Sequence, residues 1–182
     1  GDYQIEKITE QPGAFPFGTL YPAHRAEMSH AIAAEPAAVS IHSWVVRSGE
    51  HLVVVNTATG KGRNRDDKPL FHQLNSPYAD NLTHADVDPA AVTLVLMTHI
   101  HTDHVGWNTH WHKGQCHPMF PNARYICSAK ELKQCQQDSA LQELYSDSIL
   151  PLIENGQLVT IAVENSPLFD GVVRYLATTG HS

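Results

Sequence analysis

The sequence predicts a mixed α/β fold (α+β) that forms half of a four-layer αββα sandwich. An antiparallel hairpin is expected early, because two apolar stretches, residues 39–47 and 52–56, flank the turn sequence Ser-Gly-Glu-His. A strand followed by a helix is expected later, over residues 124–137. Hairpins combined with a βα unit indicate sheets covered by helices. A length of 182 residues without a linker-like shift in composition predicts one domain over residues 1–182.

The elements before this hairpin are predicted from alternation and from proline. Residues 3–8 alternate between apolar and polar side chains, which suits an edge strand. Residues 13–22 are rich in Gly, Pro and aromatic side chains, and we expect an irregular segment there. Residues 23–34 predict a helix that ends before Pro36, because the residue before a proline disfavours helical backbone.

The polar, glycine-rich residues 59–67 follow the hairpin and have two interpretations. One is a phosphate-binding loop, and the other is a mobile loop beside an active site. The GxxxxGK[ST] pattern is missing and no helix follows at once, which favours the mobile loop. Residues 78–85 are then expected to form a helix that leads to the next strand.

The later elements are predicted from caps and apolar runs. Ser128 with Glu131 three residues later is the pattern of a capping box and predicts a helix over residues 128–137. Residues 146–153 are expected to be helical or turn-like. Strands are expected at residues 124–127, 158–163 and 172–176, the last two being separated by a turn near Asp170-Gly171.

The run Thr-His-Ile-His-Thr-Asp-His-Val-Gly, residues 98–106, directly follows an apolar strand and carries four candidate metal ligands. His99 and His101 are two residues apart, so on extended backbone their side chains point the same way. Asp103 and His104 follow where the chain must turn, and they can face a second position beside the first. Imidazole and carboxylate suit zinc and similar first-row ions. The sequence therefore predicts metal binding rather than a solvated His-rich loop.

This motif resembles the signature of the metallo-β-lactamase-fold hydrolases. Three further segments are similar to that superfamily: residues 52–57, residues 87–92, and the terminal Thr-Thr-Gly-His-Ser at residues 178–182. The segments HVGWNT and FPNARY resemble the branch that contains lactonases and organophosphate hydrolases. The resemblance covers residues 38–182 and implies an αββα sandwich, of which this chain is expected to be mostly the N-terminal half.

The resemblance also implies a ligand set. His99, His101 and His181 would hold a first metal, and Asp103 and His104 a second. The expected cofactor is zinc, one or two ions, with iron or manganese as alternatives. A missing C-terminal half would supply the remaining ligands, so the second ion is expected to bind weakly. A divalent ion lowers the pKa of bound water from about 15.7 to near 7, and Asp103 would orient that water and shuttle its proton.

Asn56 departs from the pattern of the superfamily, which usually has Asp at this strand end. The resemblance implies an outer-shell role for Asn56, in which its carbonyl accepts an imidazole N–H without adding charge. Losses of this kind typically cost about 10–100-fold in metal affinity or activity. We therefore expect Asn56 to weaken the metal site, against the alternative of a neutral Asn at a strand end.

Three functions remain open from the sequence. The first is a metal-dependent hydrolase of a small ester, lactone or organophosphate. The second is a non-catalytic half-domain that associates with another chain, as a homo-oligomer or with a missing C-terminal half. The third is an iron-dependent redox protein of the same fold, since these ligands also suit iron.

Composition excludes several partners and leaves the compartment open. Formal charge is −7 and the twelve Lys and Arg residues are scattered, so no nucleic-acid surface is expected. No apolar stretch approaches the roughly 20 residues of a membrane span. A cytoplasmic location is expected, or a periplasmic or secreted one if a leader preceded Gly1.

The cysteines and the remaining histidines are not expected to be principal metal ligands. The three cysteines are expected to be ordinary thiols, because they are odd in number and lack a CxxC spacing. Cys116 is a weak candidate ligand. His110, His112 and His117 are expected in a loop that lines or covers the site.

Overall fold

The structure is a computed structural model that describes residues 3–65, 68 and 70–178. Its centre is a six-stranded mixed sheet in the order β1-β2-β3-β4-β7-β8, and β5 and β6 pair in a second, two-stranded sheet. The strands are β1 (Gln4–Pro16), β2 (Pro36–Ser48), β3 (His51–Val55), β4 (Leu94–Leu96), β5 (Thr109–His112), β6 (Gln115–Pro118), β7 (Arg124–Ser128) and β8 (Leu158–Ile161).

Helices and short 3-10 or π turns connect the strands. They are α1 (Phe17–Leu20), η1 (Pro22–Glu27), α2 (His30–Ala34), α3 (Tyr78–His84), η2 (Pro89–Ala91), α4 (Thr102–Val105), η3 (Gly106–Asn108), α5 (Ala129–Gln137), η4 (Ser139–Leu141), α6 (Gln142–Leu144), η5 (Tyr145–Ile149), α7 (Leu150–Glu154) and η6 (Val163–Asn165). This mixed α/β architecture is the predicted fold class. In the part of the chain that the structure describes, no helix is long and apolar enough to cross a membrane.

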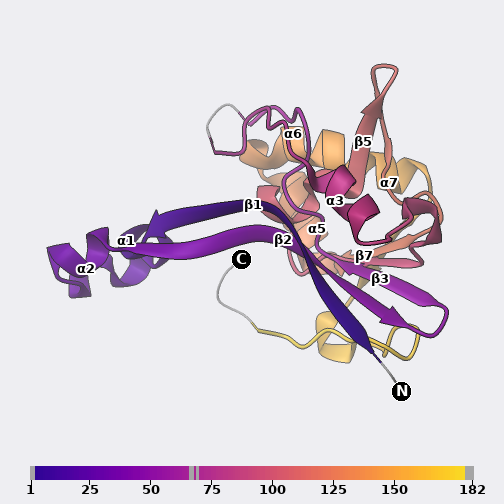
Figure 1. Cartoon of the computed structure of the whole chain (residues 1–182), viewed down its shortest axis with the longest axis horizontal. Helices are drawn as coiled ribbons and strands as arrows, with labels where there is room; N and C mark the ends of the chain where they lie inside the picture. Colours follow the sequence, from indigo (N-terminus) through magenta and orange to yellow (C-terminus); the bar gives the residue numbers. More distant parts are fainter. Residues whose placement is uncertain (1–2, 66–67, 69, 179–182) are drawn as a thin grey trace.

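The predicted hairpin and edge strand are confirmed, but β1 is much longer than expected. Strands β1 to β3 are antiparallel neighbours, and β3, β4, β7 and β8 are parallel. β1 continues into the segment predicted to be irregular, residues 13–22, because it pairs with β2 as far as Pro16 opposite Pro36. The rest of that segment forms α1 and the start of η1. Figure 1 shows the two strands leaving the body together as an arm that ends in α1 and α2.

The helix predicted over residues 23–34 is instead two pieces. The 3-10 turn η1 ends at Glu27, and α2 begins after Ser29, whose hydroxyl accepts a hydrogen bond from Ile32 N. Serine favours a cap over a helix interior, because its hydroxyl competes for backbone groups. The strand predicted at residues 172–176 is also wrong, since only an isolated bridge joins Phe169 to Val173.

The sheet buries its two faces unequally. The larger core lies on the face covered by α3, α5 and the segments around β5, with Val45, Val54, Val95 and Tyr125 fully buried. The opposite face has a smaller cluster of Val46, Val53, Leu94, Leu96, Ile126 and Phe169. Alternation along each strand sends successive side chains to opposite faces, so the strands supply both cores.

Candidate metal centre

The motif loop lies at the carboxyl end of the parallel strands. β4 ends at Leu96, the loop follows, and α4 begins at Thr102. The start of α5, directly after β7, lies at the same edge, because β4 and β7 are parallel and paired. Ligands of open α/β sheets bind at this edge. The chain therefore places the predicted ligands where a site is expected.

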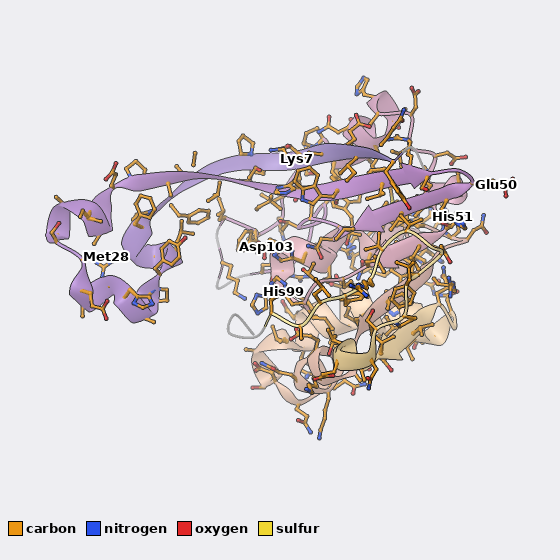
Figure 2. All side chains as sticks on the ribbon, turned by 90° about the horizontal axis from the view of Figure 1, so that it is seen from below. Lys7, Met28, Glu50, His51, His99 and Asp103 are labelled. Atoms are coloured by element: carbon orange, nitrogen blue, oxygen red, sulfur yellow. The ribbon has the colours of Figure 1, made fainter. Side chains whose placement is uncertain are left out.

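The structure brings the motif imidazoles together. The ring centroids of His99 and His101 are 4.5 Å apart, and those of His99 and His104 are 4.1 Å apart. Figure 2 shows His99 and Asp103 close to one another, far from Glu50 and His51 at the β2–β3 turn. Four candidate ligands thus share one small region of a partly buried loop.

Asp103 and His104 have the spacing of two ligands on one ion. Asp103 Oδ2 lies 3.4 Å from His104 Nε2. Two ligand atoms each about 2.0–2.2 Å from a tetrahedral zinc are about 3.3–3.5 Å apart. His104 Nδ1 is buried and has no hydrogen-bond partner among the described residues. The donor set and this spacing fit a divalent metal.

The environment of Asp103 favours its carboxylate form. Burial acts to raise its pKa, but the His104 side chain and the nearby imidazole of His99 act more strongly together, and the pKa is lowered. Asp103 is therefore ionised at neutral pH and can act as a ligand or a proton acceptor.

Asn56 is hydrogen-bonded to Thr98, a residue that was not expected to contribute to the site. Asn56 Oδ1 accepts hydrogen bonds from Thr98 N at 2.9 Å and from Thr98 Oγ1 at 3.1 Å. Thr98 Oγ1 is in turn 3.0 Å from His99 Nδ1. These bonds differ from the expected one between Asn56 and an imidazole. The only signal in the sequence was the position of Thr98, directly before the first histidine.

The Asn56–Thr98–His99 chain fixes the tautomer of His99. The amide oxygen of Asn56 can only accept, so the single hydroxyl proton of Thr98 points toward it. Thr98 Oγ1 must then accept from His99 Nδ1–H. Nδ1 carries the proton, which leaves Nε2 as the nitrogen with the lone pair, the form that a metal ligand requires.

Backbone hydrogen bonds join the end of the motif, residues 104–107, to the residues that follow β3. Thr57 N donates to His104 O, Gly106 N donates to Ala58 O at 2.8 Å, and Trp107 N donates to Thr57 O at 2.8 Å. A Cβ at Gly106 would lie 1.7 Å from the carbonyl oxygen of Thr59. Glycine is required here because the two backbone segments touch.

Glu10 rules out a phosphate cradle at the start of the 59–67 loop. Its buried carboxylate accepts from Thr59 N at 2.7 Å, Gly60 N at 3.3 Å and Trp107 Nε1 at 2.6 Å. The amides that could bind phosphate are thus bound within the protein. Arg63 is also buried and donates to Gly106 O, so this part of the loop is anchored in the core rather than open.

The third ligand predicted for the first metal, His181, lies outside the described residues. Among the residues that are described, no group of three or more His, Cys, Asp or Glu side chains is arranged to hold a metal ion. The preceding segment does return to the motif edge: Tyr175 OH lies 3.0 Å from Met97 O and 2.9 Å from Ile126 O.

The other histidines and the cysteines do not join this site. His110, His112 and His117 lie on the β5–β6 hairpin rather than in a loop. Two of them, His110 and His117, line a cavity of about 760 Å³ together with Asp88 and Ala90, which precede β4, at the end of the strand away from the motif. The expectation that they cover the site is therefore not supported. All three cysteines are free thiols, as predicted.

The model of the metallo-beta-lactamase superfamily matches residues 37–161. The chain belongs to the metallo-beta-lactamase superfamily. No curated protein matches it in sequence.

Solved structures share the fold at low sequence identity. A probable metal-dependent hydrolase from Staphylococcus aureus has a TM-score of 0.64 at 15% identity, covering 89% of this chain and 60% of that one. The hydrolase AbOPH of the beta lactamase superfamily has a TM-score of 0.62 at 18% identity, with 92% and 60% covered. AidC, a dizinc quorum-quenching lactonase, has a TM-score of 0.60 at 17% identity, with 93% and 61% covered. The chain thus spans about 60% of the length of these relatives.

Proposed function

We propose that this protein is a metal-dependent hydrolase that uses an activated water to cleave a small ester, lactone or organophosphate. The observation that supports it most is the gathering of His99, His101, Asp103 and His104 at the carboxyl edge of the sheet, with two ligand atoms at the 3.4 Å spacing of a shared ion. Membership of the superfamily points the same way.

The proposed ligands follow the predicted assignment. His99, His101 and His181 hold a first ion, and Asp103 and His104 take part in a second site. Zinc is proposed as the metal, and iron or manganese suits the same ligands less specifically. When bound, the metal lowers the pKa of a coordinated water and polarises the carbonyl or phosphoryl oxygen of the substrate.

Side chains of this protein supply orientation and proton transfer. Thr98 presents the His99 ring with Nε2 as the ligand nitrogen. The carboxylate of Asp103, which is ionised at neutral pH, accepts the proton of the attacking water at Oδ2 or Oδ1 and passes it to the leaving group. Neither step uses a serine or cysteine nucleophile.

The substrate class rests on two lines of support. The segments HVGWNT and FPNARY resemble the lactonase and organophosphate hydrolase branch, and one structural relative is described as a lactonase in complex with N-hexnoyl-L-homoserine. Small neutral esters and lactones fit this support better than β-lactams.

A hydrolysis assay tests the proposal. Metal-stripped protein is given zinc, manganese or iron, and tested on an acyl homoserine lactone, a nitrophenyl ester and an organophosphate triester. We expect metal-dependent turnover of at least one substrate, and a loss of about 100-fold or more in Asp103→Asn, from the usual size of acid–base contributions. Turnover that survives both metal removal and His99→Ala would refute it.

Association with another chain is the second candidate function, and one observation favours it. Apolar side chains are exposed on the less covered sheet face: Ile5 is 66%, Trp44 42% and Val159 40% exposed. Register places Ile5 beside Val46 and Val159 beside Ile126, both in the smaller core. Exposed apolar patches mark interaction sites. Sedimentation equilibrium tests this: a monomer at all concentrations would argue against self-association.

A further inference from the structure

Ile100 lies between the two histidines proposed to share the first metal, and its peptide N–H has an acceptor from a distant element. Ile100 N donates to Glu131 Oε2 at 3.0 Å. The side chain of Ile100 is 2% exposed and belongs to the larger core. A buried peptide N–H needs a partner, because leaving it unpaired destabilises the folded chain. Glu131 therefore fixes the backbone at the midpoint of His-Ile-His.

Glu131 reaches the motif because of the topology of the sheet. β7 is the parallel neighbour of β4, and α5 starts directly after β7. The first turn of α5 thus stands beside the loop that follows β4. The helix cap is provided by Ser128, whose Oγ accepts from Lys130 N at 3.2 Å. The sequence pattern of a capping box is present, but the carboxylate of its glutamate extends to the metal loop.

The two amides that flank His99 are held from opposite sides. Asn56, at the end of β3, accepts from Thr98 N, and Glu131, at the start of α5, accepts from Ile100 N. The first anchor is a neutral amide and the second is a carboxylate. A hydrogen bond to an ionised acceptor is about twice as strong as a neutral one, and a nearby negative charge also attracts a cation.

We infer that Glu131 is a positioning residue of the metal centre, which holds His99 and His101 in ligand geometry through the Ile100 amide and adds a negative charge that favours a divalent cation. This inference rests on the proposed metal site. Glu131 acts through the backbone of the loop and through the negative charge of its carboxylate. Its effect should therefore be measurable as a change in metal affinity in the absence of substrate.

Metal titration of the whole chain tests this role with zinc as the probe. Zinc affinity is measured by competition with a chromophoric chelator for the parent, Glu131→Gln and Glu131→Ala. We expect Glu131→Gln to weaken zinc binding about 10-fold, because the acceptor oxygen remains and the charge is lost, and Glu131→Ala to weaken it up to about 100-fold, the range for outer-shell partners. Glu50→Gln is the matched control, since this exposed glutamate at the β2–β3 turn lies far from the motif (Figure 2) and should bind zinc like the parent.

A second readout separates positioning from general stability. In the metal-free protein, the Ile100 amide should exchange faster with solvent deuterium in Glu131→Ala, while amides in β2 and β3 keep the parent rate. If Glu131→Ala fails to fold, the Gln variant still decides, since it keeps the size of the side chain. Parent-like zinc affinity in the Glu131 variants would overturn the inference. Parent-like affinity in a His99→Ala/His101→Ala variant would overturn the metal site itself, and this inference with it.

Discussion

The hydroxyl of Tyr175 lies 3.0 Å from the carbonyl oxygen of Met97, two residues before the first motif histidine. Tyr175 follows the last regular element, and Met97 follows β4, so the contact joins parts of the chain 78 residues apart. Burial raises the pKa of Tyr175, which keeps the hydroxyl protonated and able to donate. Tyr175, six residues before His181 in the sequence, is thereby anchored at the edge where the motif lies.

Replacing Thr98 with valine should weaken the metal site by releasing the His99 ring. Valine keeps the branched shape but lacks the hydroxyl that accepts from His99 Nδ1–H. We expect about a 10-fold loss of zinc affinity, the lower end of outer-shell effects. Thr98→Ser, which keeps the hydroxyl, should bind zinc like the parent.

Nitrogen NMR of the metal-free protein checks the cause. The parent should show His99 protonated at Nδ1, and Thr98→Val a mixture of the two tautomers. An Nε2-protonated ring in the parent would contradict the hydrogen-bond chain.

Replacing Asn56 with aspartate should strengthen metal binding. A carboxylate can accept from both Thr98 N and Thr98 Oγ1, as Asn56 does, and it adds a negative charge near the cation. Asn56 has a φ of 58°, a left-handed conformation that Asp also tolerates. We expect about a 10-fold gain in zinc affinity by calorimetry, and a loss in Asn56→Ala. If Asn56→Asp binds zinc with the affinity of the parent, the residue at position 56 does not influence the metal site, and this prediction is wrong.

Features of this site that depend on neighbouring residues could be predicted from the sequence, whereas contacts between residues far apart in the chain could not. The grouping of the motif side chains at one loop was predictable, because their spacing is a local property of residues 98–106, and their role as metal ligands stays a prediction. Glu131 was recognised as a capping-box residue, but its partner Ile100 is 31 positions away and is set by strand order. Strand order depends on tertiary packing, which a single sequence does not reveal.

The errors in the fold have the same origin. β1 extends to Pro16 because β2 pairs with it, so the local signals of Gly13 and Pro16 for irregular backbone were overridden. His110 and His117 were expected in a loop, but they face each other in register across a hairpin, at a ring distance of 6.3 Å. In contrast, the helix expected over residues 78–85 is present as α3 (Tyr78–His84).

Adding a methyl group at Gly106 should destabilise the protein strongly. Its Cβ would lie 1.7 Å from Thr59 O, and the contact is between backbone segments that cannot rotate away. We expect Gly106→Ala to lower the free energy of unfolding by about 3 kcal/mol, the upper range of overpacking. Gly13→Ala is the control, because its Cβ would meet only side-chain atoms at 3.6 Å and beyond. Urea unfolding measures both variants, and equal midpoints for the two would contradict this close contact between backbone segments.

The buried thiols should make the protein lose stability at high pH. Burial, with a smaller contribution from the charge of Glu131, raises the pKa of Cys127 from 9.0 to about 12, and burial raises that of Cys135 to about 11. The folded protein therefore holds these protons where the unfolded chain releases them, and stability falls above pH 9. Each such proton contributes a slope of about 1.4 kcal/mol per pH unit.

Urea unfolding at a series of pH values between 8 and 11 checks this. Cys127→Ala should flatten the loss above pH 9 by the slope of one proton. An identical slope in Cys127→Ala and the parent would show that this thiol does not titrate with a raised pKa.

Zinc K-edge X-ray absorption tests the proposed three-histidine site most directly, with the parent protein and His181→Ala each loaded with one equivalent of zinc. We expect three imidazole nitrogens at about 2.0–2.1 Å from zinc in the parent, and two in His181→Ala, which should also bind zinc more weakly. An unchanged zinc environment and affinity in His181→Ala would contradict a metal shared by His99, His101 and His181.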